Sequence, residues 1–131
     1  MTYASAAVAY REREVLTAAP GRLVVIVFDH LLVSLRRARF AMDANNIELR
    51  TESIAKAREA AMELLVTTDV DRGGAIGQNL RSIYAYLVRE LITLGGRNDV
   101  ARVDGFISIV SDLRDAFATV ATDASARVPA A

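Results

Sequence analysis

The chain has 131 residues, of which 53% are hydrophobic and 24% are charged, and its basic and acidic side chains cancel to a formal net charge of zero. This length corresponds to one domain, which can bury about 68% of the surface that its unfolded chain would expose. A neutral chain has no electrostatic attraction for nucleic acid or an anionic membrane, so neither is expected as a partner. The lack of cysteine excludes disulfides and thiol chemistry and fits a cytoplasmic protein.

The N-terminal segment is predicted to be an arm or short helix over residues 1–16. It lacks the basic start of a secretory signal, and it is too short and too charged to be a core helix. Its apolar anchors Tyr10, Val15 and Leu16 are candidate partner-binding residues. Two interpretations stay open. The arm covers part of a binding groove until a partner displaces it, or it is a frayed terminus with Tyr10 packed on the domain.

Four helices are predicted for the rest of the chain, at 20–44, 47–67, 74–94 and 99–122. Pro20 suits the first position of a helix, and turn-forming residues separate the periodic segments at 45–46, 69–74 and 95–96. Asp71 and Asn98 are the expected N-caps of the last two helices, and Gly95 or Gly96 the left-handed stop between them. Short loops imply antiparallel neighbours, so residues 17–122 form an all-α, antiparallel four-helix bundle, followed by a flexible tail at 123–131.

Each predicted helix carries a core seam, meaning apolar residues at alternating steps of three and four. This periodicity decides against a β-strand for the β-branched run at residues 24–27. The four seams are Val24, Phe28, Leu31, Leu35, Ala38 and Met42; Ile54, Ala57, Ala61 and Leu64; Ile76, Leu80, Ile83, Leu87, Leu91 and Leu94; Val103, Phe106, Val110, Leu113, Phe117 and Val120. Together they predict one bundle core.

The first helix also carries a second apolar stripe, formed by Ile26, Val33 and Phe40 at a period of seven. One explanation is that this helix is central and both stripes are core. The other is that part of the second stripe is an open groove for an amphipathic partner helix. Burying these side chains under a partner would contribute about 1.5–3 kcal/mol each, so all three are candidate binding residues.

Catalytic and metal-binding functions find no support in the sequence. His30 is the only histidine, so sites with two histidines cannot form within one chain, and no serine or carboxylate set is spaced to use it. The run GGAIGQN at 73–79 has neither the preceding strand nor the Lys-Ser or Lys-Thr of a phosphate loop. We therefore expect no enzyme, no cofactor and no metal.

The sequence resembles the flagellar secretion chaperones that bind flagellin, the FliS family, over residues 9–121. The first matching block is AYREREVLTAAPGRLVVIVFDHLL, which contains Ala9, Tyr10, Val15, Thr17, Ala18, Pro20, Leu23, Phe28 and Asp29. A second block around the third helix contains Leu80, Tyr84, Tyr86, Arg89 and Leu91, and the short blocks RND (97–99) and DLRDAF (112–117) follow. Phe117 replaces the family's usual tryptophan, and Gly95-Gly96 replaces a less flexible connection.

The resemblance implies a bundle that holds the disordered C-terminal segment of flagellin in the cytoplasm, prevents premature polymerisation and keeps it competent for type III secretion. Tyr84, expected at the core edge with its hydroxyl at the surface, and the exposed pair Tyr86 and Arg89 are further candidate contacts. Contact with the export apparatus is also compatible with this function. The alternative is a bundle that self-associates through the second stripe, as a homodimeric adaptor or scaffold without flagellin binding.

Overall fold

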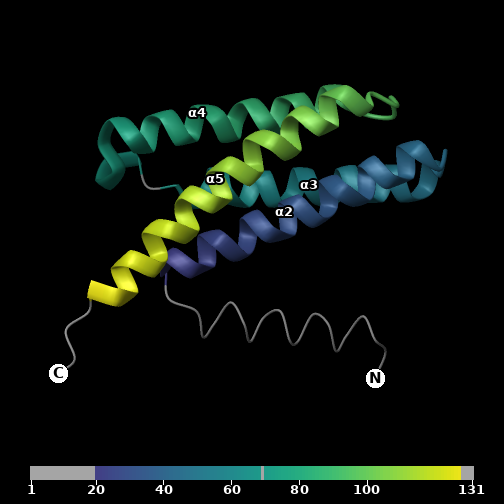
Figure 1. The fold of residues 1–131 in the computed structure, drawn as a ribbon. Helices are drawn as coiled ribbons and strands as arrows, with labels where there is room; N and C mark the ends of the chain where they lie inside the picture. The colour runs from purple at the N-terminus through teal and green to yellow at the C-terminus, as the bar shows by residue number, and fades with distance from the viewer. Residues whose placement is uncertain (1–19, 69, 128–131) are drawn as a thin grey trace, which may run out of the picture.

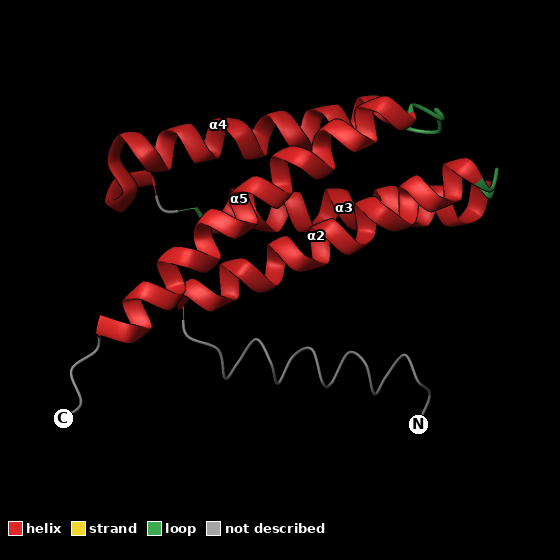
Figure 2. Ribbon diagram, viewed as in Figure 1, coloured by secondary structure: helices red, strands yellow, loops and turns green. Residues whose placement is uncertain are grey.

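The computed structural model describes residues 20–68 and 70–127, and these residues form four α-helices and no strand (Figures 1 and 2). The helices are α2 (Pro20–Asp43), α3 (Ile47–Thr67), α4 (Val70–Leu94) and α5 (Val100–Arg127). The predicted all-α bundle is confirmed, and the β-branched run at 24–27 is helical. The predicted arm at residues 1–16 lies outside the described residues.

The helix ends follow the predicted turn residues, with three differences. α4 begins at Val70 and is irregular at Gly74, whose φ of 57° and ψ of −136° interrupt the helix where its start was predicted. α5 is capped by Asp99, whose carboxylate accepts a hydrogen bond from the Arg102 amide at 3.1 Å, rather than by Asn98. It continues to Arg127, so residues 123–127, expected in the tail, are helical.

The α2–α3 turn and the α4–α5 turn lie at the same end of the bundle. Two residues of left-handed conformation and the side chain of Arg50 shape this end. Asn45 has a φ of 52° and Gly95 a φ of 50°, so these two residues turn the chain after α2 and α4. Arg50 of α3 donates a hydrogen bond to the Asn98 side chain at 2.7 Å, and Asn98 in turn contacts Asn45 at 3.4 Å. Asn98 therefore connects the two turns instead of capping α5.

The core is centred on Phe28, which is fully buried on α2. Its ring lies 5.3 Å from that of Phe117 on α5 and 6.1 Å from that of Tyr84 on α4, measured between centroids. The predicted seams of α2 and α3 are buried, apart from the partly buried Val24. Alanines such as Ala38, Ala57 and Ala61 allow close approach of these two helices.

The four helices do not form a square bundle in which every helix packs along both of its neighbours. α2 packs against α3 and α5, and α3 packs against α4. α4 and α5 meet near the turn that joins them and diverge toward the other end of the bundle (Figure 1). Two predicted core residues at the divergent end are consequently exposed, Ile76 by 73% and Val120 by 66%. The prediction was wrong for these two because none of the four described helices covers them.

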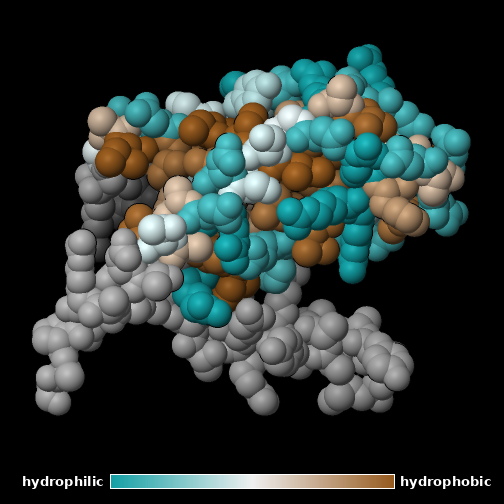
Figure 3. Space-filling model, viewed as in Figure 1, coloured by the Kyte–Doolittle hydropathy of each residue, from teal (hydrophilic) through white to brown (hydrophobic). Residues whose placement is uncertain are grey.

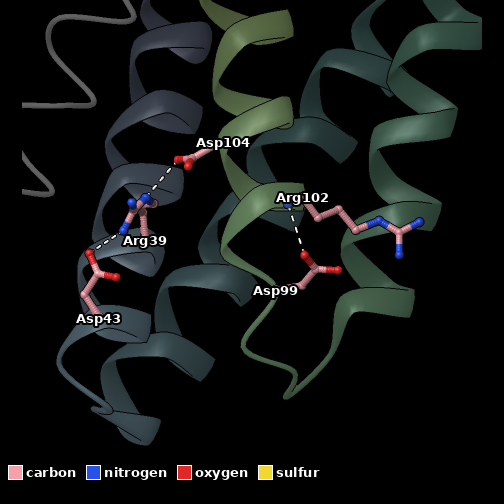
Figure 4. A network of polar contacts seen from close by, with 5 residues as sticks. All are labelled: Arg39, Asp43, Asp99, Arg102 and Asp104. Carbon is pink, nitrogen blue, oxygen red and sulfur yellow. Dashed lines mark hydrogen bonds and ion pairs between the residues drawn. The ribbon is translucent and has the colours of Figure 1, made fainter.

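Ion pairs hold α5 beside α2 and α4. Arg39 of α2 bridges Asp43 on its own helix and Asp104 on α5, where its Nε lies 2.8 Å from the carboxylate (Figure 4). Arg102 of α5 pairs with Glu90 of α4 close to the α4–α5 turn. Since all of these side chains are at least partly exposed to solvent, the pairs orient the helices more than they stabilise them.

Candidate peptide-binding groove between α4 and α5

An open apolar hollow lies between the diverging helices α4 and α5, and we call it the α4–α5 groove. It has a volume of about 460 Å³ and is lined by Ser82, Ile83, Tyr86, Ile109, Asp112 and Leu113. In the space-filling view, hydrophobic side chains gather between these two helices where they separate (Figure 3). The groove is accessible because Tyr86 is 42% exposed and Ile109 is 39% exposed.

The groove combines seam residues at the edge of the core with side chains outside the seams, such as Tyr86 and Ile109. Ile83 and Leu113 are seam residues that stay only partly buried. At the turn end the Arg102–Glu90 pair connects the helices, so the gap between them widens away from that pair. An open apolar surface between two helices is suited to an amphipathic or extended peptide.

A second hollow of about 230 Å³ lies toward the divergent end of the bundle. Its lining comes from all four helices and the turn after α3: Val24, Leu64, Thr67, Thr68, Ile76, Gly77, Leu80, Tyr84 and Phe117. On α4, Leu80 and Tyr84 of this hollow flank Ile83 of the groove in sequence, and on α5 Phe117 lies one turn beyond Leu113. The two hollows therefore share α4 and α5 as walls, and α2 and α3 contribute only to the second.

Burial controls the chemistry of Tyr84. The residue is 2% exposed, which differs from the expected core-edge position with a surface hydroxyl. Burial raises the pKa of Tyr84 to about 12, because the phenolate would lose its hydration. Tyr84 thus acts as part of the aromatic cluster with Phe28.

One charged pair anchors α5 beside the second hollow. Arg114 donates from Nε to Asp29 of α2 at 2.8 Å. This hydrogen bond, followed by the charge of Asp29, raises the pKa of the Arg114 guanidinium, so it remains a cation. Since Arg114 follows Leu113 directly in the sequence, the pair helps to fix the α5 wall of the groove.

The structure separates the three residues of the predicted second stripe on α2. Ile26 is 6% exposed, whereas Val33 and Phe40 are 45% and 66% exposed. The stripe is therefore neither wholly core nor one continuous docking track. Val33 and Phe40 also lie on a different helix from either wall of the α4–α5 groove.

The other candidate residues are distributed as follows. Tyr86 lines the groove, and Arg89 is exposed on the same helix without lining it. Tyr10, Val15 and Leu16 lie outside the described residues. Ile83, Ile109 and Leu113 line the groove although they were not predicted as binding residues. Ile83 and Leu113 looked like core because they belong to the seams, and only the divergence of the helices leaves them accessible.

Neither a metal site nor a membrane span is found in the part of the chain that the structure describes. Over residues 20–68 and 70–127, no three His, Asp or Glu side chains come together as ligands would. Within the same ranges, none of the helices combines the length and the apolarity needed to cross a bilayer. The side chains that line the groove are apolar apart from Ser82, Asp112 and the Tyr86 hydroxyl. The groove can therefore interact with a partner mainly through apolar contacts.

Comparison with known proteins identifies relatives over nearly the whole chain. A family model described as Flagellar protein FliS matches residues 2–124. The flagellar secretion chaperone FliS of Escherichia coli is 33% identical over 107 residues, which cover 81% of this chain and 79% of that protein. Its counterpart from Bacillus subtilis is 30% identical over 112 residues, covering 83% and 80%. That from Salmonella typhimurium is 28% identical over 115 residues, covering 87% and 85%.

Proposed function

The chain belongs to the FliS family of flagellar secretion chaperones, and we propose that it binds the disordered C-terminal segment of flagellin in the cytoplasm before export. Binding would prevent premature polymerisation, because the terminal segments of a filament subunit are the parts that associate with other subunits. It would also keep the segment competent for type III secretion.

The observation that carries this proposal is the α4–α5 groove. A chaperone for a disordered chain needs an accessible apolar surface that the chain can follow, and it needs no nucleotide. The groove supplies such a surface because no helix within residues 20–68 and 70–127 covers Ile83, Tyr86 and Ile109 completely. We place the flagellin segment there, with its apolar side chains between α4 and α5.

The charge pattern around the groove favours a segment with apolar anchors and few charges of its own. The lining contains one carboxylate, Asp112, and no basic side chain. A guest that places several charges in the groove would lose their hydration without gaining partners. Affinity is then expected to come from apolar burial, and specificity from the spacing of the anchors.

Catalysis is not part of the proposed function. The relatives are named as chaperones, and the groove lining is mainly apolar, without histidine, lysine or cysteine. After binding, the complex would be delivered to the export apparatus, which we propose as a second protein partner. Flagellin would leave the chaperone there without covalent chemistry.

The test is a calorimetric titration of the full chain with a synthetic peptide of the flagellin C-terminal segment. We expect saturable one-to-one binding. Ile109→Glu, at an accessible groove position, should weaken it by about 10-fold or more, since losing one buried apolar side chain costs about 1.5–3 kcal/mol.

Val33→Glu is the matched control, because Val33 is also a β-branched residue of similar exposure but lies on α2. It should leave peptide affinity unchanged, and circular dichroism should show both variants folded. Absence of saturable binding by the unmodified chain would reject flagellin binding. Binding that is lost with Val33→Glu and kept with Ile109→Glu would instead place the guest on the predicted α2 stripe.

A further inference from the structure

Asp112 is the only charged side chain that lines the α4–α5 groove, and it is exposed. It forms no ion pair and no hydrogen bond with any residue that the structure describes. Its neighbours on α5 differ in this respect, since Asp104 pairs with Arg39 and Asp115 lies 3.5 Å from Arg114. Among the described residues, Asp112 is therefore an unpaired anion beside an apolar hollow.

Arg89 is a corresponding cation beyond the other end of the groove. Ser82, Tyr86 and Arg89 are spaced by four and three residues on α4, which puts them on one side of the helix. Arg89 is exposed, and no carboxylate in the described part of the chain pairs with it. The adjacent Glu90 is held by Arg102. The groove side of α4 thus leads to a positive charge near the α4–α5 turn.

The space on the α5 side of Arg89 is open. Gly105 lies five residues after the start of α5, and Arg89 lies five residues before the end of α4, so the two are at the same level of the helix pair. Gly105 shares one side of α5 with Ile109 and Asp112, and a Cβ added to it would meet no atom within 4 Å. A guest that lies along the groove can therefore reach Arg89.

The two charges lie at different levels of the groove, with apolar side chains between them. Asp112 is twelve residues from the start of α5, whereas Arg89 is five residues from the end of α4. At a rise of about 1.5 Å per residue, this difference corresponds to about 10 Å along the helices. That length spans about two turns of a helical guest or about three residues of an extended one. Tyr86 and Ile109 lie at intermediate levels.

We propose that Asp112 and Arg89 select the guest segment by its charges and fix its direction in the groove. The guest has a basic side chain on the Asp112 side of its apolar anchors and an acidic side chain on the Arg89 side. Its basic end then points toward the divergent end of the bundle, and its acidic end toward the α4–α5 turn (Figure 1). This inference rests on the proposed flagellin binding and deepens it, because it names the charges that the bound segment carries.

Apolar contacts alone give the guest little direction, because the free energy of burial depends mainly on the area that is covered. Charges supply the direction. An ion pair at an exposed rim strengthens binding by only about 2- to 5-fold. A guest bound in the reverse direction would place like charges together at both ends, which disfavours that direction further. One basic and one acidic side chain remain compatible with a mostly apolar guest.

The test is calorimetry of the full chain with two peptides. One is the flagellin C-terminal peptide, and the other is the same peptide with its basic residues replaced by glutamate and its acidic residues by lysine. The unmodified chain should bind the original peptide about 10-fold more tightly, since two ion pairs become two like-charge pairs. The double variant Asp112→Arg/Arg89→Glu keeps the net charge of the chain and should prefer the charge-reversed peptide instead.

Glu63→Arg/Arg37→Glu is the matched control, because it exchanges the same charges on α3 and α2, outside the groove. It should keep the preference of the unmodified chain. If the unmodified chain binds both peptides equally, or if Asp112→Arg/Arg89→Glu keeps the original preference, the charge selection is wrong while flagellin binding stands. If the unmodified chain does not bind the original peptide, both proposals are rejected.

The direction is measured separately by paramagnetic broadening. The chain contains no cysteine, so Arg97→Cys in the α4–α5 turn provides a single attachment point for a nitroxide. Resonances from the acidic end of an isotope-labelled flagellin peptide should broaden more than those from its basic end. Stronger broadening of the basic end, or equal broadening of both ends, would overturn the assigned direction.

Discussion

Asp29 on α2 and Arg114 on α5, 85 residues apart in the sequence, form an ion pair with 2.8 Å between Oδ1 and Nε. Asp29 directly follows the central core residue Phe28, and Arg114 directly follows the groove residue Leu113. The pair thus connects the core of the bundle to one wall of the α4–α5 groove.

The contribution of this pair to stability should be small and dependent on salt. The side chains are 46% and 34% exposed, so solvent screens their attraction. A double-mutant cycle with Asp29→Asn and Arg114→Gln, measured by urea unfolding, should give a coupling energy of about 0.5 kcal/mol. The coupling should decline in about 1 M salt. A coupling that is unaffected by salt would contradict this description.

Burial of Tyr84 predicts a loss of stability at alkaline pH. Its pKa is about 12 in the folded chain and 10.0 for the free side chain, so folding favours the neutral phenol. This contribution is complete below pH 10 and disappears as the pH rises toward 12. Unfolding free energies at a series of alkaline pH values should therefore fall more steeply for the unmodified chain than for Tyr84→Phe. Tyr86→Phe, on the same helix, should keep the steep fall because Tyr84 is still present.

Truncation of two phenylalanines of α2 should change stability to very different extents. Phe28 is 0% exposed and packs against Tyr84 and Phe117, so Phe28→Ala should lower the free energy of unfolding by about 3–5 kcal/mol. Phe40 is 66% exposed, and Phe40→Ala should change it by less than about 0.5 kcal/mol. Urea unfolding at a protein concentration where the chain is monomeric measures both. A comparable loss for Phe40→Ala would show that the monomer buries this ring.

The N-terminal arm is predicted to compete with the guest. If residues 1–16 cover part of the flagellin site, removing residues 2–14 should increase the affinity for the flagellin peptide, because no cover has to be displaced. Calorimetry compares the shortened chain with the full one. Replacing the same residues by a Gly/Ser segment of equal length controls for chain length. Equal affinities for the full and shortened chains would eliminate the cover.

Helix positions could be predicted well because they depend on local chemistry. Asn46 caps α3 by accepting a hydrogen bond from the Leu49 amide at 3.1 Å, and Gly95 provides the left-handed turn after α4. Periodic apolar residues then identified the faces that turn inward in α2 and α3. The cap of α5 was misplaced by one residue, because Asn98 and Asp99 are both suitable caps in sequence. Only the turn at the bundle end, where Arg50 binds Asn98, separates their roles.

The candidate site could be predicted only in part. Tyr86 was identified from the resemblance, but Ile83 and Leu113 carry the same periodic signal as true core residues. A helical period tells which side of a helix is apolar, not whether another helix covers that side. Ile76 and Val120 illustrate this limit, since both continue a core seam and both are exposed.

The sequence by itself therefore determined the four helices of the bundle, the turns between them and their apolar faces. It could do so because hydrogen bonding, capping and periodicity act over a few neighbouring residues. The tertiary structure decided which apolar faces remain open. Helix crossing depends on contacts between residues far apart in the chain, such as Asp29 with Arg114, and it leaves α4 and α5 diverging. That divergence converts part of the expected core into the α4–α5 groove.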